Sequence, residues 1–158
     1  EKVNKKVVVY LSMCFGNPYG DVWNLDIINH WIYKLKDLGI KIISLSDTIG
    51  SSTPQSIKSI FNSVLKNHSD IEFGAHLHSD PSSWHNKMHS AFEAGCRRFD
   101  GAIGGYGGCP MASNQIVGNM PTEKIISFLK TQKTFNNINS LRFENCYNQS
   151  LEVFNKFH

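Results

Sequence analysis

The chain has 158 residues, of which 41% are hydrophobic and 18% charged, a composition that excludes a disordered tail and suffices for one domain with a real core. Its net charge of +3 suits an acidic ligand but selects none, and its scattered Lys and Arg residues indicate no nucleic-acid-binding motif. No apolar run approaches the roughly 20 residues that cross a bilayer. We therefore expect a cytoplasmic protein without nucleic-acid or membrane partners.

Short β-branched runs alternate with amphipathic stretches along the whole chain. The strands are predicted at Val7–Leu11, Lys41–Leu45, Ile71–Leu77 and Arg97–Ile103. The helices are predicted at Asn24–Leu38, Thr53–Asn67 and Ser83–Ala94, from Pro121-Thr122 to about Thr131, and from beyond Asn139 to near the end. The strands start 34, 30 and 26 residues apart, which is the spacing of parallel βα units. Four such units make either a small open α/β sheet or half of a barrel, and periodicity does not separate the two.

Unusual polar and glycine-rich segments follow each predicted strand. They are Ser12–Tyr19, Ser46–Gly50, the His76-Leu77-His78 triplet, and Gly104–Pro110. Since the carboxyl ends of parallel strands meet at one edge, where α/β folds assemble their sites, these segments predict a single site.

His76 and His78 are the sharpest local signal. Residues two apart on a strand point to the same face, so both imidazoles can converge on one cation. A bare HxH is more often a pair of histidines whose hydrogen bonds are made within the protein. Here, however, the position of the pair at the expected catalytic edge favours a metal site. His85 and His89 are four residues apart on one face of a predicted helix and could also bind a metal, but a solvated helix face is the better interpretation.

Cys109, Asp47 and Asn119 are weaker candidates. Cys109 ends the glycine-rich GGYGGCP stretch, where a thiol on a mobile loop can move a proton or act as a nucleophile; an incidental loop cysteine is the alternative. Asp47 can orient substrate or transfer a proton, or it can simply form a turn with Thr48. Asn119 can offer an amide oxygen to a metal, or it can be an ordinary turn residue. The four cysteines include no CxxC pair, which predicts free thiols.

Taken together, these residues resemble the 3-hydroxy-3-methylglutaryl-CoA lyases, particularly the bacterial ones. The segments that carry the resemblance are YLSMCFGNPYGD, ISLSDTIG, AHLHSD and GCRRFDGAIGGYGGCPMASNQIVGNMPTE. HxH is shared with the wider superfamily, whereas the GGCP loop followed by GN-x-PTE is specific. The resemblance implies a (β/α)8 TIM barrel, with residues 1–158 as its C-terminal half and supplying strands five to eight.

The resemblance also implies roles for individual residues. His76, His78 and Asn119 would bind a divalent metal, with Mg²⁺ or Mn²⁺ expected from the family, although the ligand types also allow zinc. Cys109 would be the catalytic thiol, and Asp47 and His76 would also act in catalysis. The implied activity is that of an oxo-acid lyase. Such an enzyme breaks a carbon–carbon bond of 3-hydroxy-3-methylglutaryl-CoA to give acetyl-CoA and acetoacetate, in leucine degradation and ketone-body formation.

The family's first strand carries an Arg-Asp pair for substrate and metal, and no such strand precedes Val7. We therefore expect the chain to need the N-terminal half of the barrel as a partner and to be inactive alone. Two alternatives stay open: a carboligase of the same superfamily, such as an isopropylmalate synthase, and a non-catalytic half-barrel remnant. The sequence does not decide whether the protein forms a homo-oligomer.

Overall fold

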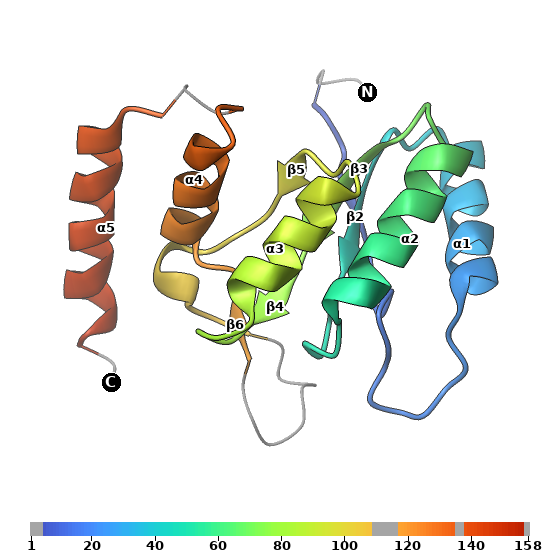
Figure 1. The fold of residues 1–158 in the computed structure, drawn as a ribbon, viewed down its shortest axis with the longest axis horizontal. Coiled ribbons are helices and arrows are strands. Elements are labelled where there is room, and N and C mark those ends of the chain that lie inside the picture. Colours follow the sequence, from blue (N-terminus) through green and yellow to red (C-terminus); the bar gives the residue numbers. More distant parts are fainter. Residues whose placement is uncertain (1–4, 109–116, 135–137, 157–158) are drawn as a thin grey trace.

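A four-stranded parallel sheet forms the centre of the molecule. The computed structural model describes residues 5–108, 117–134 and 138–156. The strands are β1 (Val9–Leu11), β2 (Ile42–Ser46), β3 (Glu72–His76) and β5 (Arg98–Phe99), and their spatial order β1-β2-β3-β5 follows the sequence (Figure 1). Within the described part of the chain β1 and β5 each pair on one side only, so the sheet is open at both edges.

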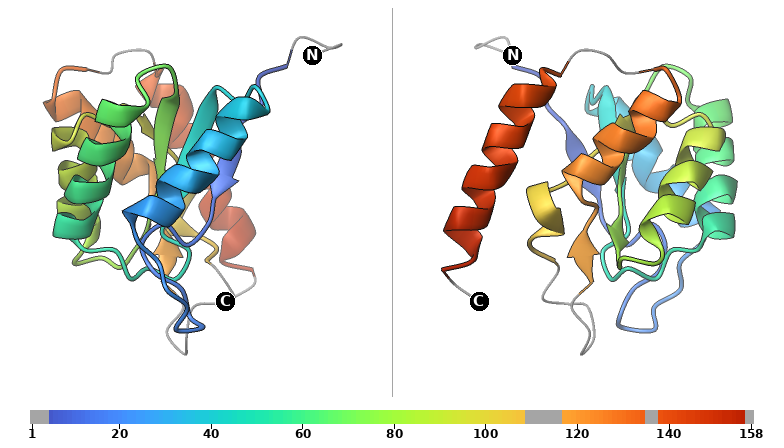
Figure 2. Two further views of the ribbon diagram at one scale, coloured as in Figure 1. Left: turned by 90° about the vertical axis from the view of Figure 1, so that its right-hand side faces the viewer. Right: turned by 60° about the vertical axis from the view of Figure 1, so that its left-hand side comes forward.

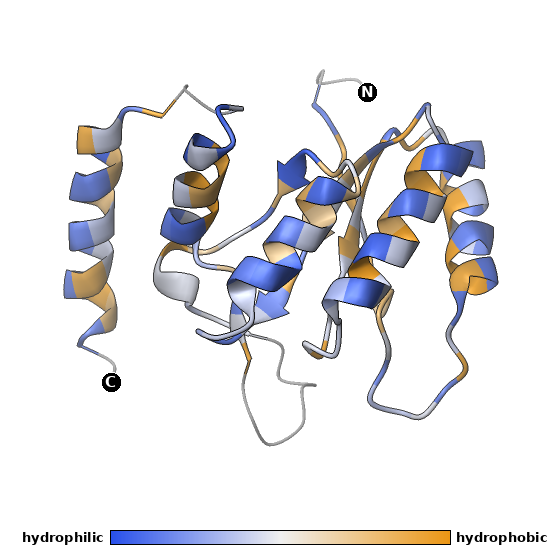
Figure 3. Ribbon diagram, viewed as in Figure 1, coloured by the Kyte–Doolittle hydropathy of each residue, from blue (hydrophilic) through white to orange (hydrophobic). Residues whose placement is uncertain are grey.

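Three helices follow the first three strands of the sheet and cover one of its faces. They are α1 (Leu25–Asp37), α2 (Pro54–Asn67) and α3 (Trp84–Glu93), lying side by side in Figures 1 and 2. Figure 3 shows that α2 and α3 turn mostly hydrophilic residues outward. Their apolar sides pack on the sheet and form a core. This core includes Ile32, Ile43, Phe61 and Met88, which are fully buried. The parallel βα architecture expected from the sequence is therefore present.

The predicted helix boundaries agree closely with the observed ones. Asn24 caps α1 by accepting a hydrogen bond from the Ile27 amide, and Thr53 and Ser56 form a capping box before α2. The last two helices are α4 (Thr122–Thr131) and α5 (Ser140–Phe154). Figure 2 shows α5 standing at the far side of α4, away from the sheet. Among the described residues, no helix is long and apolar enough to span a bilayer.

The first predicted strand begins two residues late, at Val9, and two other predicted strands end earlier than expected. The third ends at His76, and the chain continues into β4 (His78–Ser79), which pairs antiparallel with β6 (Gly118–Asn119). The fourth ends at Phe99 and is followed by a 3-10 turn, η1 (Ile103–Gly105). Gly104 and Gly105 have φ of +67° and +70°, which a strand cannot accommodate. Both departures occur where the chain leaves the sheet and builds its carboxyl edge.

Candidate functional site

A cavity of about 430 Å³ lies at the carboxyl ends of the strands. Its lining residues come from five segments of the chain and are Tyr10, Ser12, Ser46, Thr48, His76, His78, Gly108 and Asn119. The structure thus brings the three predicted metal ligands to one place. The ring centroids of His76 and His78 are 5.4 Å apart, with the ring planes at 84° to each other.

His78 is held in one orientation by the backbone. Its ring is buried, and Nδ1 donates a hydrogen bond to the Asp47 carbonyl oxygen at 2.7 Å. Burial lowers the pKa of His78, and the neighbouring His76 and Lys87 lower it further, against the opposing effect of the Asp47 bond. The ring is therefore neutral at physiological pH, and with the proton on Nδ1 its Nε2 carries the lone pair that a metal needs.

His76 contacts an acidic group but makes no close hydrogen bond with it. Its Nδ1 lies 3.7 Å from Asp100 Oδ2, and this buried nitrogen has no hydrogen-bond partner among the described residues. The Tyr10 ring packs edge-on against the imidazole, with centroids 5.3 Å apart. An unsatisfied buried imidazole nitrogen is uncommon in a folded protein and marks His76 as a candidate functional residue.

Asp100 and Tyr10 belong to the site although the sequence analysis did not select them. Ser44 Oγ donates to Asp100 Oδ2 at 2.8 Å, and Tyr10 lies near this carboxylate. Burial acts to raise the pKa of Asp100, but the neighbouring His76, Ser44 and Tyr10 together outweigh burial and lower it. Burial and the nearby carboxylate raise the pKa of Tyr10. Asp100 directly follows β5, which ends at Phe99. The sequence analysis selected polar residues that follow a strand, but it extended this strand to Ile103 and therefore passed over Asp100.

Asn119 reaches the cavity because β6 pairs with β4. His78 and Asn119 are directly opposite each other in this antiparallel pair. Asn119 Nδ2 donates to the Tyr106 carbonyl oxygen at 2.9 Å, which leaves the amide oxygen outside this bond. A carbonyl-type oxygen is a donor that hard divalent cations accept.

The Asp47 carboxylate is fully engaged. The residue is 1% exposed, Oδ1 accepts from the Ser52 amide at 3.0 Å, and Oδ2 accepts from the Ser52 hydroxyl and from Lys87 Nζ, the latter at 2.9 Å. Sequence reasoning missed Lys87, because a lysine on an amphipathic helix is normally solvated. Burial of Lys87 could have been inferred from its position four residues before Ala91, because residues four apart share a helix face and Ala91 is on the buried side of α3.

The remaining candidates lie elsewhere or outside the description. Cys109 is outside the described residues; Gly108, which immediately precedes it, lines the cavity. His85 and His89 are exposed and stack at 6.1 Å beside Phe128, as a surface pair does. Asp80 caps the turn before α3, and bonds from Ser82 and Ser83 lower its pKa to about 2.

The donor set fits a divalent cation, provided that other groups complete it. Within the described ranges no three His, Cys, Asp or Glu side chains gather as a metal cluster, so the two imidazoles and the Asn119 oxygen would be a partial set. Nε2 of the His78 ring is suited to bind metal, and His76 presents a second imidazole at the same cavity. Mg²⁺ and Mn²⁺ keep open positions for substrate oxygens and water, and such a set would leave them.

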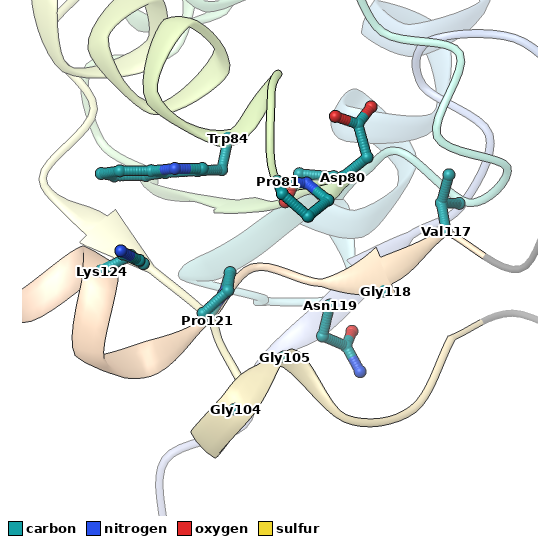
Figure 4. A pocket seen from close by; sticks show the side chains of 11 residues that line it. Asp80, Pro81, Trp84, Gly104, Gly105, Val117, Gly118, Asn119, Pro121 and Lys124 are labelled. Carbon is teal, nitrogen blue, oxygen red and sulfur yellow. The ribbon is translucent and has the colours of Figure 1, made fainter.

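A second cavity, of about 730 Å³, lies on the other side of β6. Figure 4 shows it between Trp84 and Pro81 on one side and Lys124 and Pro121 on the other, with the Asn119 side chain directed away from Trp84 and Lys124. Lys124 Nζ is 5.6 Å from the centroid of a Trp84 ring. Asn119 lines both this outer cavity and the one that contains the histidines.

A parallel βα sheet with an HxH pair and a polar cavity at its carboxyl edge is the architecture of the α/β-barrel class of proteins. The HMGL-like family model matches residues 11–148, and the chain belongs to this family.

Several relatives named as lyases agree with this assignment. The hydroxymethylglutaryl-CoA lyase YngG of Bacillus subtilis is 30% identical over 138 residues, which are 87% of this chain and 46% of that protein. The (R)-citramalyl-CoA lyase of Chloroflexus aurantiacus is 29% identical over 118 residues, 75% of this chain and 37% of that protein. The chain thus spans less than half of the length of these relatives.

Solved structures show the same fold. The crystal structure of the Bacillus subtilis HMG-CoA lyase matches with a TM-score of 0.87 and 28% identity, over 98% of this chain and 51% of that one. An HMG-CoA lyase from Acinetobacter baumannii, solved with coenzyme A and 3-methylmalate, matches with a TM-score of 0.80 and 27% identity, over 94% of this chain and 48% of that one.

Proposed function

We propose that this chain forms the metal-binding half of a hydroxymethylglutaryl-CoA lyase, supplying barrel strands five to eight. The observation that carries the proposal is the convergence of His76, His78 and Asn119 on one cavity at the carboxyl edge of the sheet. Relatives named as lyases of CoA thioesters support the substrate class. The proposed reaction cleaves 3-hydroxy-3-methylglutaryl-CoA to acetyl-CoA and acetoacetate.

This cleavage needs a proton to leave the tertiary hydroxyl group and another to reach the carbon that becomes the methyl group of acetyl-CoA. A bound Mg²⁺ or Mn²⁺ would polarise the substrate oxygens. His76, beside Asp100 and Tyr10, is the described group placed to hold a proton at the cavity wall. Cys109 is the proposed donor to carbon, and Gly108 at the cavity wall supports this because it directly precedes the thiol.

The same proposal includes a partner, the N-terminal half of the barrel. The open edges of β1 and β5 are unpaired within the described residues, and such edges favour strand addition. Beside β1, Trp23, Ile27 and Trp31 line a small crevice with Leu11 and remain 40%, 39% and 49% exposed. An apolar stripe next to an open strand edge fits the next βα unit of a parallel barrel.

The test is acetoacetate release by the 158-residue chain with Mg²⁺ or Mn²⁺, alone and mixed with an N-terminal half supplied from a homologous lyase. We expect activity only in the mixture, and Cys109→Ser should remove most turnover while substrate and metal still bind, because a hydroxyl is a far weaker acid than a thiol. Activity toward citramalyl-CoA alone would correct the acyl group, and synthase activity with acetyl-CoA and a 2-oxo acid would favour the carboligase. Strong activity of the chain by itself would contradict the partner proposal.

A further inference from the structure

Lys87 is a buried ammonium group with every donor occupied. It is 4% exposed, on the inner side of α3 next to Met88. Its Nζ donates to three oxygens, which belong to the Asp47 carboxylate at 2.9 Å, the Gly50 carbonyl at 3.0 Å and the His78 carbonyl at 2.9 Å. An ammonium has three N–H donors, so Lys87 has no capacity left for a ligand.

These three acceptors come from two different segments. Asp47 and Gly50 belong to the turn after β2, and His78 begins β4, so Lys87 joins the two segments from the helix side. Asp47 completes the connection through its own backbone. Its amide donates to the His76 carbonyl at 2.9 Å, and its carbonyl accepts from His78 Nδ1 at 2.7 Å.

The orientation of the His78 ring therefore depends on a residue that never reaches the cavity. We propose that Lys87 is a positioning residue that, through Asp47, holds His78 in the tautomer with the proton on Nδ1, and that Asp47 itself serves as the anchor of this arrangement and not as a proton carrier. Only the metal assigned to His78 Nε2 rests on the proposed function; the hydrogen-bonded arrangement does not.

The chemistry of burial explains why both charges are needed. Removing Lys87 alone would leave the buried Asp47 carboxylate without its cation and the Gly50 and His78 carbonyl oxygens without the Lys87 donor, which is costly at buried positions. Removing both charges together avoids the unpaired carboxylate. The turn after β2 would then lose its attachment to α3, and the Asp47 carbonyl would no longer be held against His78.

The decisive experiment compares the wild-type chain with the Asp47→Asn/Lys87→Met double variant and with Lys58→Met, in which an exposed lysine of α2 is removed. The ring nitrogens of His78 are assigned by 15N NMR in metal-free protein. We expect a single Nδ1–H tautomer in the wild type and in Lys58→Met, and a mixture with the Nε2–H form in the double variant. Isothermal titration with Mn²⁺ should show about 10- to 100-fold weaker binding in the double variant, as is typical when the outer partner of a metal ligand is lost.

Circular dichroism establishes that the double variant is folded; if it is not, Asp47→Asn alone should shift the tautomer in the same direction. An unchanged single tautomer in a folded variant would overturn the proposal. If no lyase activity appears in any reconstituted mixture while the tautomer shifts as expected, the proposed function fails and the positioning role stands.

Discussion

His78 and Asn119 face each other across the antiparallel pair formed by β4 and β6, although 41 positions separate them in the sequence. Neither strand is part of the main sheet. This short pair carries the second histidine and the amide to the cavity that His76 enters from β3. The proposed metal site therefore depends on the pairing of two strands of only two residues each.

Loss of either residue should weaken metal binding. We expect His78→Ala and Asn119→Ala each to weaken Mn²⁺ binding by about tenfold or more, since one lost ligand bond worth ~1.4 kcal/mol has that effect. Isothermal titration measures it, with His85→Ala as the control because His85 is an exposed histidine of α3. Equal affinity in His78→Ala and His85→Ala would reject the assignment.

The buried thiols should resist alkylation. Burial raises the pKa of both Cys14 and Cys96 to about 12, whereas Cys146 is exposed. At pH 8 a thiol with such a pKa is a thiolate in roughly one molecule in ten thousand. Mass spectrometry after iodoacetamide treatment should find Cys146 modified, and Cys14 and Cys96 modified only after denaturation. Early modification of Cys96 would mean that the α3–β5 connection opens readily.

Stability should fall as the solution is acidified. Burial lowers the pKa of His68 and of His78 in the folded chain, below the value of about 6.5 of an unfolded histidine. Below pH 6.5 the unfolded chain therefore binds protons that the folded chain does not, and the free energy of unfolding decreases. Above that pH these two groups do not change the free energy of unfolding. Urea unfolding between pH 7.5 and 5 measures this dependence.

His68→Phe is the matched variant for that measurement. His68 is fully buried between Tyr33 and Phe73, with Nε2 donating to Asn29 Oδ1 at 3.0 Å and Nδ1 lacking a partner among the described residues. The variant should be less stable at pH 7.5, because Asn29 loses its donor, yet show a shallower decline toward pH 5. A slope as steep as that of the wild type would exclude His68 as a source.

Gly50 should not tolerate a side chain. Its φ is +73°, and a Cβ would lie 2.6 Å from Val117 Cγ2. We expect Gly50→Ala to destabilise the fold by about 1–3 kcal/mol, from backbone strain and from displacement of the segment before β6. Thermal unfolding tests this, and Gly20→Ala is the control, because Gly20 also has positive φ but an added Cβ there meets nothing within 4 Å. Equal destabilisation in both variants would attribute the effect to backbone strain alone.

Trp31→Ser should weaken reassembly with the N-terminal half of the barrel. A half-exposed tryptophan next to an open strand edge has the character of an interface anchor, and we expect affinity to fall about tenfold or more. Leu38→Ser, at the end of α1 and 78% exposed, should have little effect. Native-state titration of the two halves by fluorescence provides the measurement, and equal affinity for Trp31→Ser would place the interface elsewhere.

The sequence predicted the elements better than it predicted the site. The helix limits follow from local signals such as Thr53, Pro54 and Gly39, which act within a few residues. A site containing His76 and His78 could be expected because parallel strands share a carboxyl edge, whereas Asn119 reaches it on β6, outside the parallel sheet. The Lys87–Asp47 pair could not be expected, because it depends on how deeply one helix face is buried, a property of the packed molecule. The pairing of β4 with β6 was missed for a similar reason: two-residue strands have no periodicity.

The strand order β1-β2-β3-β5 also has a consequence for how the chain folds. Each new strand adds to the outer edge of its immediate predecessor, so no strand needs to insert between two that are already paired. Such a sheet can grow in the order in which a ribosome delivers it, because each strand pairs with the strand made just before it. The cavity is the exception: it needs residue 119, which follows the last strand of the sheet, so the chain would acquire the capacity to hold an ion only after the sheet is complete.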